Sequence, residues 1–238
     1  MIRRIPSTRR HEGQGAQVRR LFPTLQQRTI DPFVLFDEFH VVPPAHFPDH
    51  SHSGLEVVTY LMEGGFRHRD NLGNDSTVLA GGAQRFTAGS GIVHAEHPVG
   101  DRVHGLQLWI VLPQALKGIE PSYQAVPQLA WETRDGVHRC WIVGGSSPIR
   151  LHTPVEYFAV RLSAGHRYWH MLPSGWQGFA YVLQGEIRLN DVPLRTAEGT
   201  VIRGEEQLFC TAVQDARWVL AVGKPWQEPI RLYGGSVL

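Results

Sequence analysis

The sequence has few cysteines, almost no net charge and no long apolar run, and each shortage excludes a class of protein. Only Cys140 and Cys210 occur among the 238 residues, too few for a disulfide framework, so we expect buried, reduced thiols. The formal net charge of +1 gives no broad attraction to nucleic acid or to a membrane surface. Because no apolar stretch reaches the length of a membrane span and the N-terminus lacks the apolar core of a signal peptide, we expect a cytoplasmic protein.

Runs that favour helices are also scarce. The chain contains 25 glycines and 16 prolines, and apolar segments of roughly four to eight residues recur between turn signals, which is typical of an all-β sandwich or barrel. One such segment, 55–62, precedes Gly64-Gly65, which we interpret as a turn. The length of 238 residues leaves room for one large domain or two small ones.

The one concentration of charge is basic and lies at the start of the chain. We interpret it as a solvated strand and turn, with contact to an anionic partner as the alternative. Its members are Arg3, Arg4, Arg9, Arg10, Arg19 and Arg20.

Two short patterns carry the main chemical signal. His50-Ser51-His52 follows a proline-rich stretch, and His94-Ala95-Glu96 follows a run containing Gly89 and Gly91. Because side chains alternate along a strand, both outer members of each pattern project from one face. Three imidazoles and one carboxylate from two strands suit a divalent transition metal with open coordination positions. A histidine on its own is more often a surface or hydrogen-bonded side chain, and we interpret the remaining histidines in that way.

The second half of the chain repeats the first in a weaker form, which predicts two copies of one barrel. A constant shift lays the region of Tyr181 and Gly185 on the region of Tyr60 and Gly64. No histidine or carboxylate then stands at the positions of the histidine pair, so only the first copy is expected to hold a metal. We expect an N-terminal metal-binding domain over 1–120, a linker over 121–128, and a degenerate domain over 129–238 whose C-terminal tail packs back across the molecule.

The ordered motifs resemble the pirin family of bicupins. They occupy residues 35–39, 50–65, 87–96 and 104–109; Ser51 and Ser53 depart from the Pro and Arg that the family often has around the second histidine. The resemblance implies two antiparallel β-barrels of the cupin type (double-stranded β-helices), with a metal site only in the N-terminal barrel. It also implies one metal, first of all Fe(II), with Zn, Mn, Ni, Co or Cu as alternatives. The implied ligands are His50, His52, His94 and Glu96.

The resemblance leaves two functions open. The first is an enzyme of the quercetin 2,3-dioxygenase type, which opens a flavonol or other planar phenolic ring with O₂. The second is a redox-sensing, metal-containing regulatory module that binds a protein partner. We favour the enzyme because the ligand set leaves coordination positions open, whereas structural metal sites are usually closed. A monomer is expected, because a duplicated barrel buries its interface within one chain.

Two carboxylates have further expected roles. Glu96 is expected to be a metal ligand, and a catalytic role as proton acceptor is the second interpretation. Glu56 lies four residues after His52, so on an unbroken strand it would share that face and could orient an imidazole. Of the two, we favour a purely structural carboxylate for Glu56. We expect His68 and His104 in loops or at strand edges.

Overall fold

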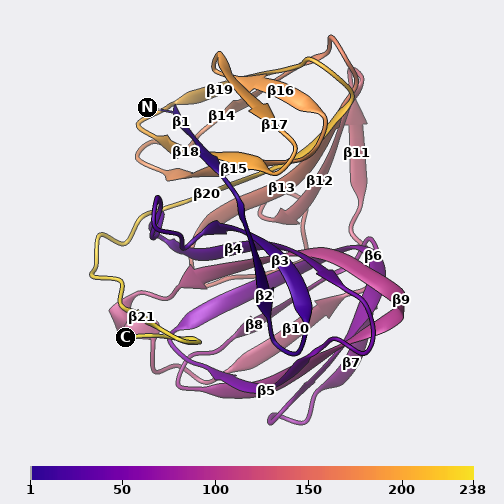
Figure 1. Cartoon of the computed structure of the whole chain (residues 1–238). Coiled ribbons are helices and arrows are strands. Elements are labelled where there is room, and N and C mark those ends of the chain that lie inside the picture. Colours follow the sequence, from indigo (N-terminus) through magenta and orange to yellow (C-terminus); the bar gives the residue numbers. More distant parts are fainter. Residues whose placement is uncertain (1) are drawn as a thin grey trace.

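The computed structural model describes residues 2–238, which form two lobes built almost entirely of β-strands (Figure 1). The first lobe is a curved nine-stranded sheet in the order β10-β8-β6-β9-β4-β3-β2, with β5 paired to β9 and β7 paired to β6. Its strands are β2 (Thr8–Glu12), β3 (Ala16–Phe22), β4 (Phe33–Val41), β5 (Phe47–His52), β6 (Leu55–Asp70), β7 (Asp75–Leu79), β8 (Ala83–Thr87), β9 (Ile92–Val111) and β10 (Ser122–Val126).

The second lobe has two sheets. The seven-stranded sheet has the order β1-β18-β15-β20-β13-β12-β11 and the four-stranded sheet the order β14-β19-β16-β17. The bounds of these strands are β1 (Ile2–Pro6), β11 (Trp131–Arg134), β12 (Val137–Val143), β13 (Val155–Leu162), β14 (Arg167–Met171), β15 (Gln177–Gln184), β16 (Glu186–Leu189), β17 (Val192–Arg195), β18 (Glu198–Arg203), β19 (Gln207–Ala212) and β20 (Ala216–Gly223). The predicted all-β bicupin fold is confirmed.

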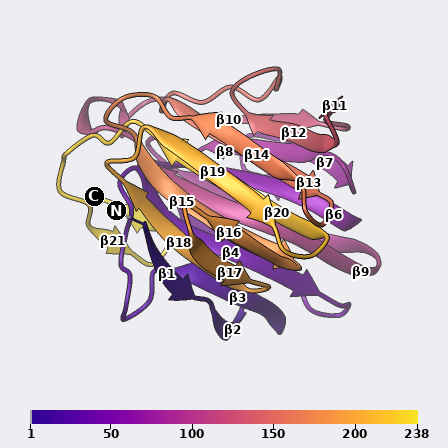
Figure 2. The ribbon, with the colours of Figure 1, turned by 90° about the horizontal axis from the view of Figure 1, so that it is seen from above.

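Each end of the chain packs on the lobe formed mainly by the other half of the sequence. The N-terminal strand β1 pairs with β18 of the second lobe, whereas the C-terminal hairpin of β21 (Leu232–Tyr233) and β22 (Ser236–Val237) returns to the first lobe. Both ends lie on the same side of the molecule (Figure 2). Residues 122–126, inside the expected linker, form β10 and pair with β8. The boundaries at residues 120 and 129 stay a prediction.

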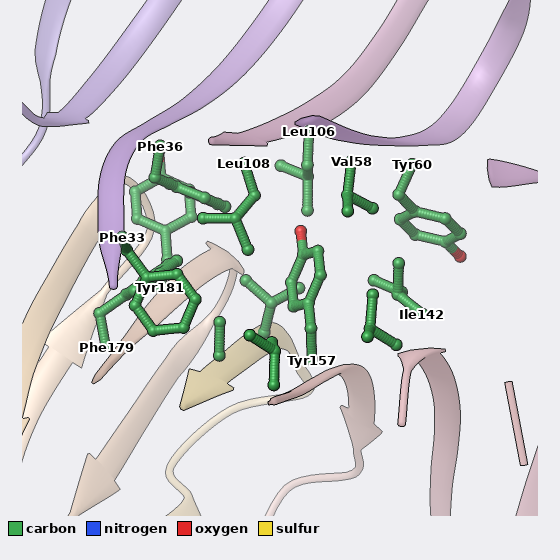
Figure 3. Close-up of a cluster of buried hydrophobic side chains, with 14 of the residues drawn as sticks. Phe33, Phe36, Val58, Tyr60, Leu106, Leu108, Ile142, Tyr157, Phe179 and Tyr181 are labelled. Atoms are coloured by element: carbon green, nitrogen blue, oxygen red, sulfur yellow. The ribbon is translucent and has the colours of Figure 1, made fainter. Parts of the chain in front are cut away.

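The largest apolar core lies between the lobes. Side chains of β4, β6 and β9 face those of β12, β13 and β15 (Figure 3). Phe179 contacts three phenylalanine rings of the first lobe at centroid distances between 4.7 and 5.5 Å, and edge and tilted contacts of this kind add to the burial of apolar area. The lobes therefore share one core and hold each other in place.

The segment Gly64-Gly65 is not a turn, which corrects the prediction. Strand β6 continues through it to Asp70, with irregular pairing to β9 between Leu61 and Gly65. Gly64 has a φ of +65°, and a Cβ there would meet the carbonyl oxygen of Arg102. Gly185 of the second half has a φ of +84°, and a Cβ there would meet the carbonyl oxygen of Asp215. The glycine that the two repeats share thus permits a close backbone approach in each repeat, and in β6 it lies within the irregular pairing to β9.

The remaining large-scale expectations concern thiols, helices and the tail. Cys140 and Cys210 are buried and unpaired within residues 2–238, as predicted. Over the same residues the helical element is η1 (Gln114–Leu116), and none has the length and hydropathy that a membrane span requires. The C-terminal tail packs on the first lobe, where Val237 joins the apolar cluster around Leu55 and Phe86.

Candidate metal centre

Strands β5 and β9 carry the predicted ligands side by side. The two strands are antiparallel, with His50 opposite His94. Proline-rich chain leads into β5, and β9 begins at Ile92, directly after the glycine-containing turn of residues 89–91. Alternation along β9 places His94 and Glu96 on one face. His52, His94 and Glu96 are each at most 2% exposed, and His50 is half-buried at the open side.

The structure brings the four side chains together as two overlapping groups. Nitrogen atoms of His50, His52 and His94 lie within 4.8 Å of one another. A second group, with donor atoms within the same distance, contains His94, Glu96 and His68. His94 belongs to both groups, so the predicted ligands surround it.

The hydrogen bonds leave one free nitrogen on each of the three histidines. His50 Nδ1 donates to the Pro48 carbonyl at 2.7 Å and His52 Nδ1 donates to the Gly235 carbonyl at 2.8 Å. The Nε2 atom of His94 is buried without a hydrogen-bond partner among the described residues. Buried polar atoms are almost always paired, so an unpartnered imidazole nitrogen beside two others fits a metal ligand. The residues therefore fit a divalent transition metal.

Burial also sets the charge of His52 and His94. Burial lowers the pKa of His52 to about 4, and the neighbouring His50 adds to this. Burial and the charges of the neighbouring histidines hold the pKa of His94 far below its usual range. Both rings are neutral at pH 7, which is the form that binds metals.

The Glu96 carboxylate is held by two amides. Gln84 Nε2 donates to Glu96 Oε1 at 2.6 Å, and Gln107 Nε2 donates to Oε2 at 3.2 Å. Burial raises the pKa of Glu96 to about 7, although these two hydrogen bonds favour the charged form. A cation at the neighbouring nitrogens would favour the charged form further.

A cavity of about 650 Å³ opens onto this centre. His50, His52 and Gln107 lie in its wall, together with an ion pair in which Arg20 Nη2 is 2.7 Å from Asp37 Oδ2. Its apolar wall is aromatic and aliphatic, and glycines of the C-terminal hairpin form part of the rim. These apolar members are Val18, Leu35, Phe39, Phe47, Trp109 and Leu232.

Sequence reasoning missed His68, which is not a loop residue. It is fully buried in the second part of β6, stacked on Tyr123 at a centroid distance of 4.3 Å. His68 Nε2 lies 3.0 Å from an Asp70 oxygen, and His68 Nδ1 lies 3.4 Å from His94 Nδ1. The sequence did carry a signal: Phe66, His68 and Asp70 alternate with their neighbours at the spacing that places them on one face of a strand. We overlooked it because we interpreted Gly64-Gly65 as a turn.

The hydrogen bonds of Glu56 are those of the favoured structural carboxylate, and no ligand histidine is among its partners in the described residues. Its carboxylate accepts hydrogen bonds from Thr87 Oγ1 and from the backbone N–H groups of His152 and Thr153. The orienting role required an unbroken strand after His52, but Gly54 has a φ of +70° and separates β5 from β6. The alternation therefore cannot be extended from His52 to Glu56, which instead joins the two halves.

A third group of histidine and carboxylate side chains has its hydrogen bonds within the protein. Glu38, His40 and His104 have donor atoms within 4.8 Å of one another. Glu38 accepts hydrogen bonds from His104 Nε2 at 2.9 Å and from the hydroxyl of Tyr181, in the second lobe, at 2.7 Å. The guanidinium of Arg19 lies 3.4 Å from the same carboxylate. These partners stabilise the charged form of Glu38, and the contact with Tyr181 fits a junction between the lobes.

Comparisons with known proteins match both halves of the chain. The family model "Pirin" matches residues 15–110 and "Pirin C-terminal cupin domain" matches residues 157–237. Pirin-like protein 2 of Arabidopsis thaliana is 37% identical, over 100% of this chain and 79% of its own. Pirin of Homo sapiens is 35% identical, over 98% of this chain and 86% of its own. A solved quercetin 2,3-dioxygenase from Acinetobacter baumannii has a TM-score of 0.91 and 26% identity, over 99% of this chain and 83% of that one.

Proposed function

This chain belongs to the pirin family, and from that premise we propose that it is a metal-dependent dioxygenase of the quercetin 2,3-dioxygenase type. The proposed ligands are His50, His52, His94 and Glu96, the proposed metal is Fe(II), and the site is confined to the N-terminal half. The substrates would be O₂ and a flavonol or a related planar phenol. The likeness to the Acinetobacter baumannii quercetin 2,3-dioxygenase supports the reaction class.

The cavity beside His50 and His52 is the observation that carries this proposal. Its volume of about 650 Å³ lies within the range of small-molecule sites, roughly 300 to 1,000 Å³. The rings of Phe39, Phe47 and Trp109 line it, and aromatic walls pack well against a planar substrate. A closed structural metal site would have no need of such a space.

The residues around the cavity have separable roles. A bound metal would supply activation of O₂ and lower the pKa of the substrate hydroxyl. Gln107 contacts Glu96 through Nε2 and accepts a hydrogen bond from Trp109 Nε1 at 2.9 Å through Oε1. It therefore fixes the orientation of the Trp109 ring relative to the ligand carboxylate. The apolar wall would exclude water from the reacting ring.

For Glu96 we favour the ligand role over the role of proton acceptor. Both of its oxygens accept amide hydrogen bonds, and it is buried and not part of the described cavity wall. A general base must come within hydrogen-bond reach of the proton it takes. Glu96 as a base stays the weaker of the two interpretations.

Oxygen consumption after anaerobic loading with Fe(II) tests the proposal. Wild-type protein with quercetin should take up O₂ in proportion to bound iron, and His52→Ala and Glu96→Ala should abolish uptake. His138→Ala is the matched control, because His138 is exposed in the second lobe and its loss should change neither iron content nor uptake.

The outcomes separate the enzyme from the regulatory module. Full iron loading without uptake on flavonols or simpler phenols would overturn the dioxygenase and favour a redox-sensing module that binds a protein partner. A monomeric state and a cytoplasmic location belong to the proposal as well, and sedimentation and cell fractionation test them.

A further inference from the structure

The last residues of the chain are fastened to the first lobe at several points. The Asp31 carboxylate accepts hydrogen bonds from the backbone N–H groups of Trp226 at 3.1 Å and Gln227 at 2.8 Å. Further along, Val237 N donates to the Ser53 carbonyl at 3.0 Å. The C-terminal hairpin, defined here as Leu232–Val237, is thereby held beside the short connection that separates His52 from β6.

Within this hairpin, Gly235 lies directly against a proposed metal ligand. Its carbonyl accepts the hydrogen bond from His52 Nδ1 at 2.8 Å. A Cβ on Gly235 would meet the Ser51 carbonyl and lie 2.8 Å from His52 Nδ1. The φ of Gly235 is not in the left-handed region, so close approach to the ring, and not backbone conformation, is what requires a glycine.

The two histidines of β5 differ in how they are held. His50 Nδ1 bonds the carbonyl of Pro48, two residues away in the chain, whereas the partner of His52 is 183 residues away. The orientation of His50 therefore follows from local chain geometry. The orientation of His52 depends instead on the C-terminal hairpin, which follows the second lobe in the sequence and must pack on the first lobe to reach this ring.

We propose that the C-terminal hairpin is a positioning element of the metal site, acting through the carbonyl of Gly235 on His52. The hydrogen bond fixes the tautomer of His52 so that the Nε2 lone pair faces His50 and His94, and it also fixes the angle of the ring. Leu232, Gly234 and Gly235 line the same cavity, so the hairpin shapes the substrate entrance as well. The degenerate second half thus completes a site to which it contributes no ligand. This inference rests on the proposed ligand set.

Metal titration of the full chain tests the hairpin without any need for turnover. Gly235→Ala should weaken Ni²⁺ binding by about 10- to 100-fold, the usual effect of losing an outer partner of a ligand histidine. It should also change the visible absorption spectrum of the Co²⁺-loaded protein. Gly118→Ala is the matched control, because its φ is also ordinary and no described atom lies within 4 Å of the added Cβ. The control should bind both metals like the wild type.

A double-mutant cycle distinguishes positioning from a general loss of structure. In the background of His52→Ala, adding Gly235→Ala should cause no further loss of Ni²⁺ affinity, because the side chain that the hairpin orients is gone. An equal loss in both backgrounds would overturn the proposal, as would wild-type affinity and an unchanged Co²⁺ spectrum in Gly235→Ala.

A chain that ends at residue 230 provides a second variant if Gly235→Ala fails to fold. It removes the carbonyl altogether, and circular dichroism checks that the β-structure persists. Weakened Ni²⁺ binding by a folded protein is expected, and full affinity would contradict the inference. If the wild type binds no Ni²⁺ or Co²⁺, the proposed metal site itself fails, which is a different outcome from a metal site that is insensitive to the hairpin.

Discussion

His68 and His94 meet through their Nδ1 atoms, 3.4 Å apart in a fully buried contact. The other nitrogen of His68 lies 3.0 Å from Asp70. If Asp70 accepts from His68 Nε2, then His68 Nδ1 is an acceptor and His94 Nδ1 must be the donor. The Nε2 lone pair of His94 is then left for a metal. Two consecutive hydrogen bonds, from Asp70 through His68 to His94, thereby orient the ring of His94.

Replacing His68 should therefore weaken the metal site while keeping the fold. His68→Phe retains a ring against Tyr123 but removes the acceptor, and we expect roughly tenfold weaker Ni²⁺ binding, the lower end of the range for such partners. Isothermal titration measures the change. His97→Phe is the control, because His97 is exposed and stacks on His46. Equal affinity of the two variants would contradict the orienting role of His68.

Glu56 should affect stability and leave the metal unaffected. Its carboxylate accepts hydrogen bonds from Thr87 and from two backbone N–H groups of the second half. Glu56→Gln removes the charge and one acceptor oxygen, and we expect the free energy of unfolding to fall by about 3 kcal/mol. Urea unfolding measures it.

The control for Glu56 is a partly exposed carboxylate. Glu63 pairs with Arg102 at the surface, and Glu63→Gln should cost under about 1 kcal/mol. Weaker Ni²⁺ binding in Glu56→Gln at unchanged stability would contradict the structural role and favour the interpretation that Glu56 orients a ligand.

The contribution of Glu38 should depend on pH. Burial alone would raise its pKa, but hydrogen bonds from His104, His40 and Tyr181 outweigh burial and hold the pKa below the ordinary 4.5. A carboxyl whose pKa is lowered by folding stabilises the protein above its unfolded pKa, and this contribution is lost as the pH falls. Glu38→Gln should therefore cost about 3 kcal/mol at pH 7 and progressively less below pH 4.5.

Urea unfolding of wild type and Glu38→Gln at a series of pH values checks the sign. A difference that stays constant from pH 7 to pH 3 would mean that the carboxylate charge is not what stabilises the junction. Asp75→Asn serves as the control, because Asp75 and its partner Arg67 are about half exposed and a surface pair contributes little at any pH.

Much of the site could be predicted because strand geometry is local. The period of two places His50 and His52 on one face, and His94 and Glu96 on another, wherever the strands lie. The two copies of one barrel were also visible, because Gly64 and Gly185 make the same close backbone approach at positive φ in each repeat and no other residue fits there easily. The prediction failed at Gly64-Gly65 because a glycine pair marks a turn and a bulge equally well.

The sequence by itself determined the all-β bicupin class, the two histidine patterns and the lack of a matching pattern in the second copy, since residue type and spacing suffice for these. Only the tertiary structure decided which atoms hold the Nδ1 nitrogens of His52 and His94. Gly235 reaches His52 and His68 reaches His94 across long separations in the chain, and Glu56 turns to the second half. Such contacts depend on how the sheets and the chain end pack, and side-chain periodicity within one strand carries no information about that packing.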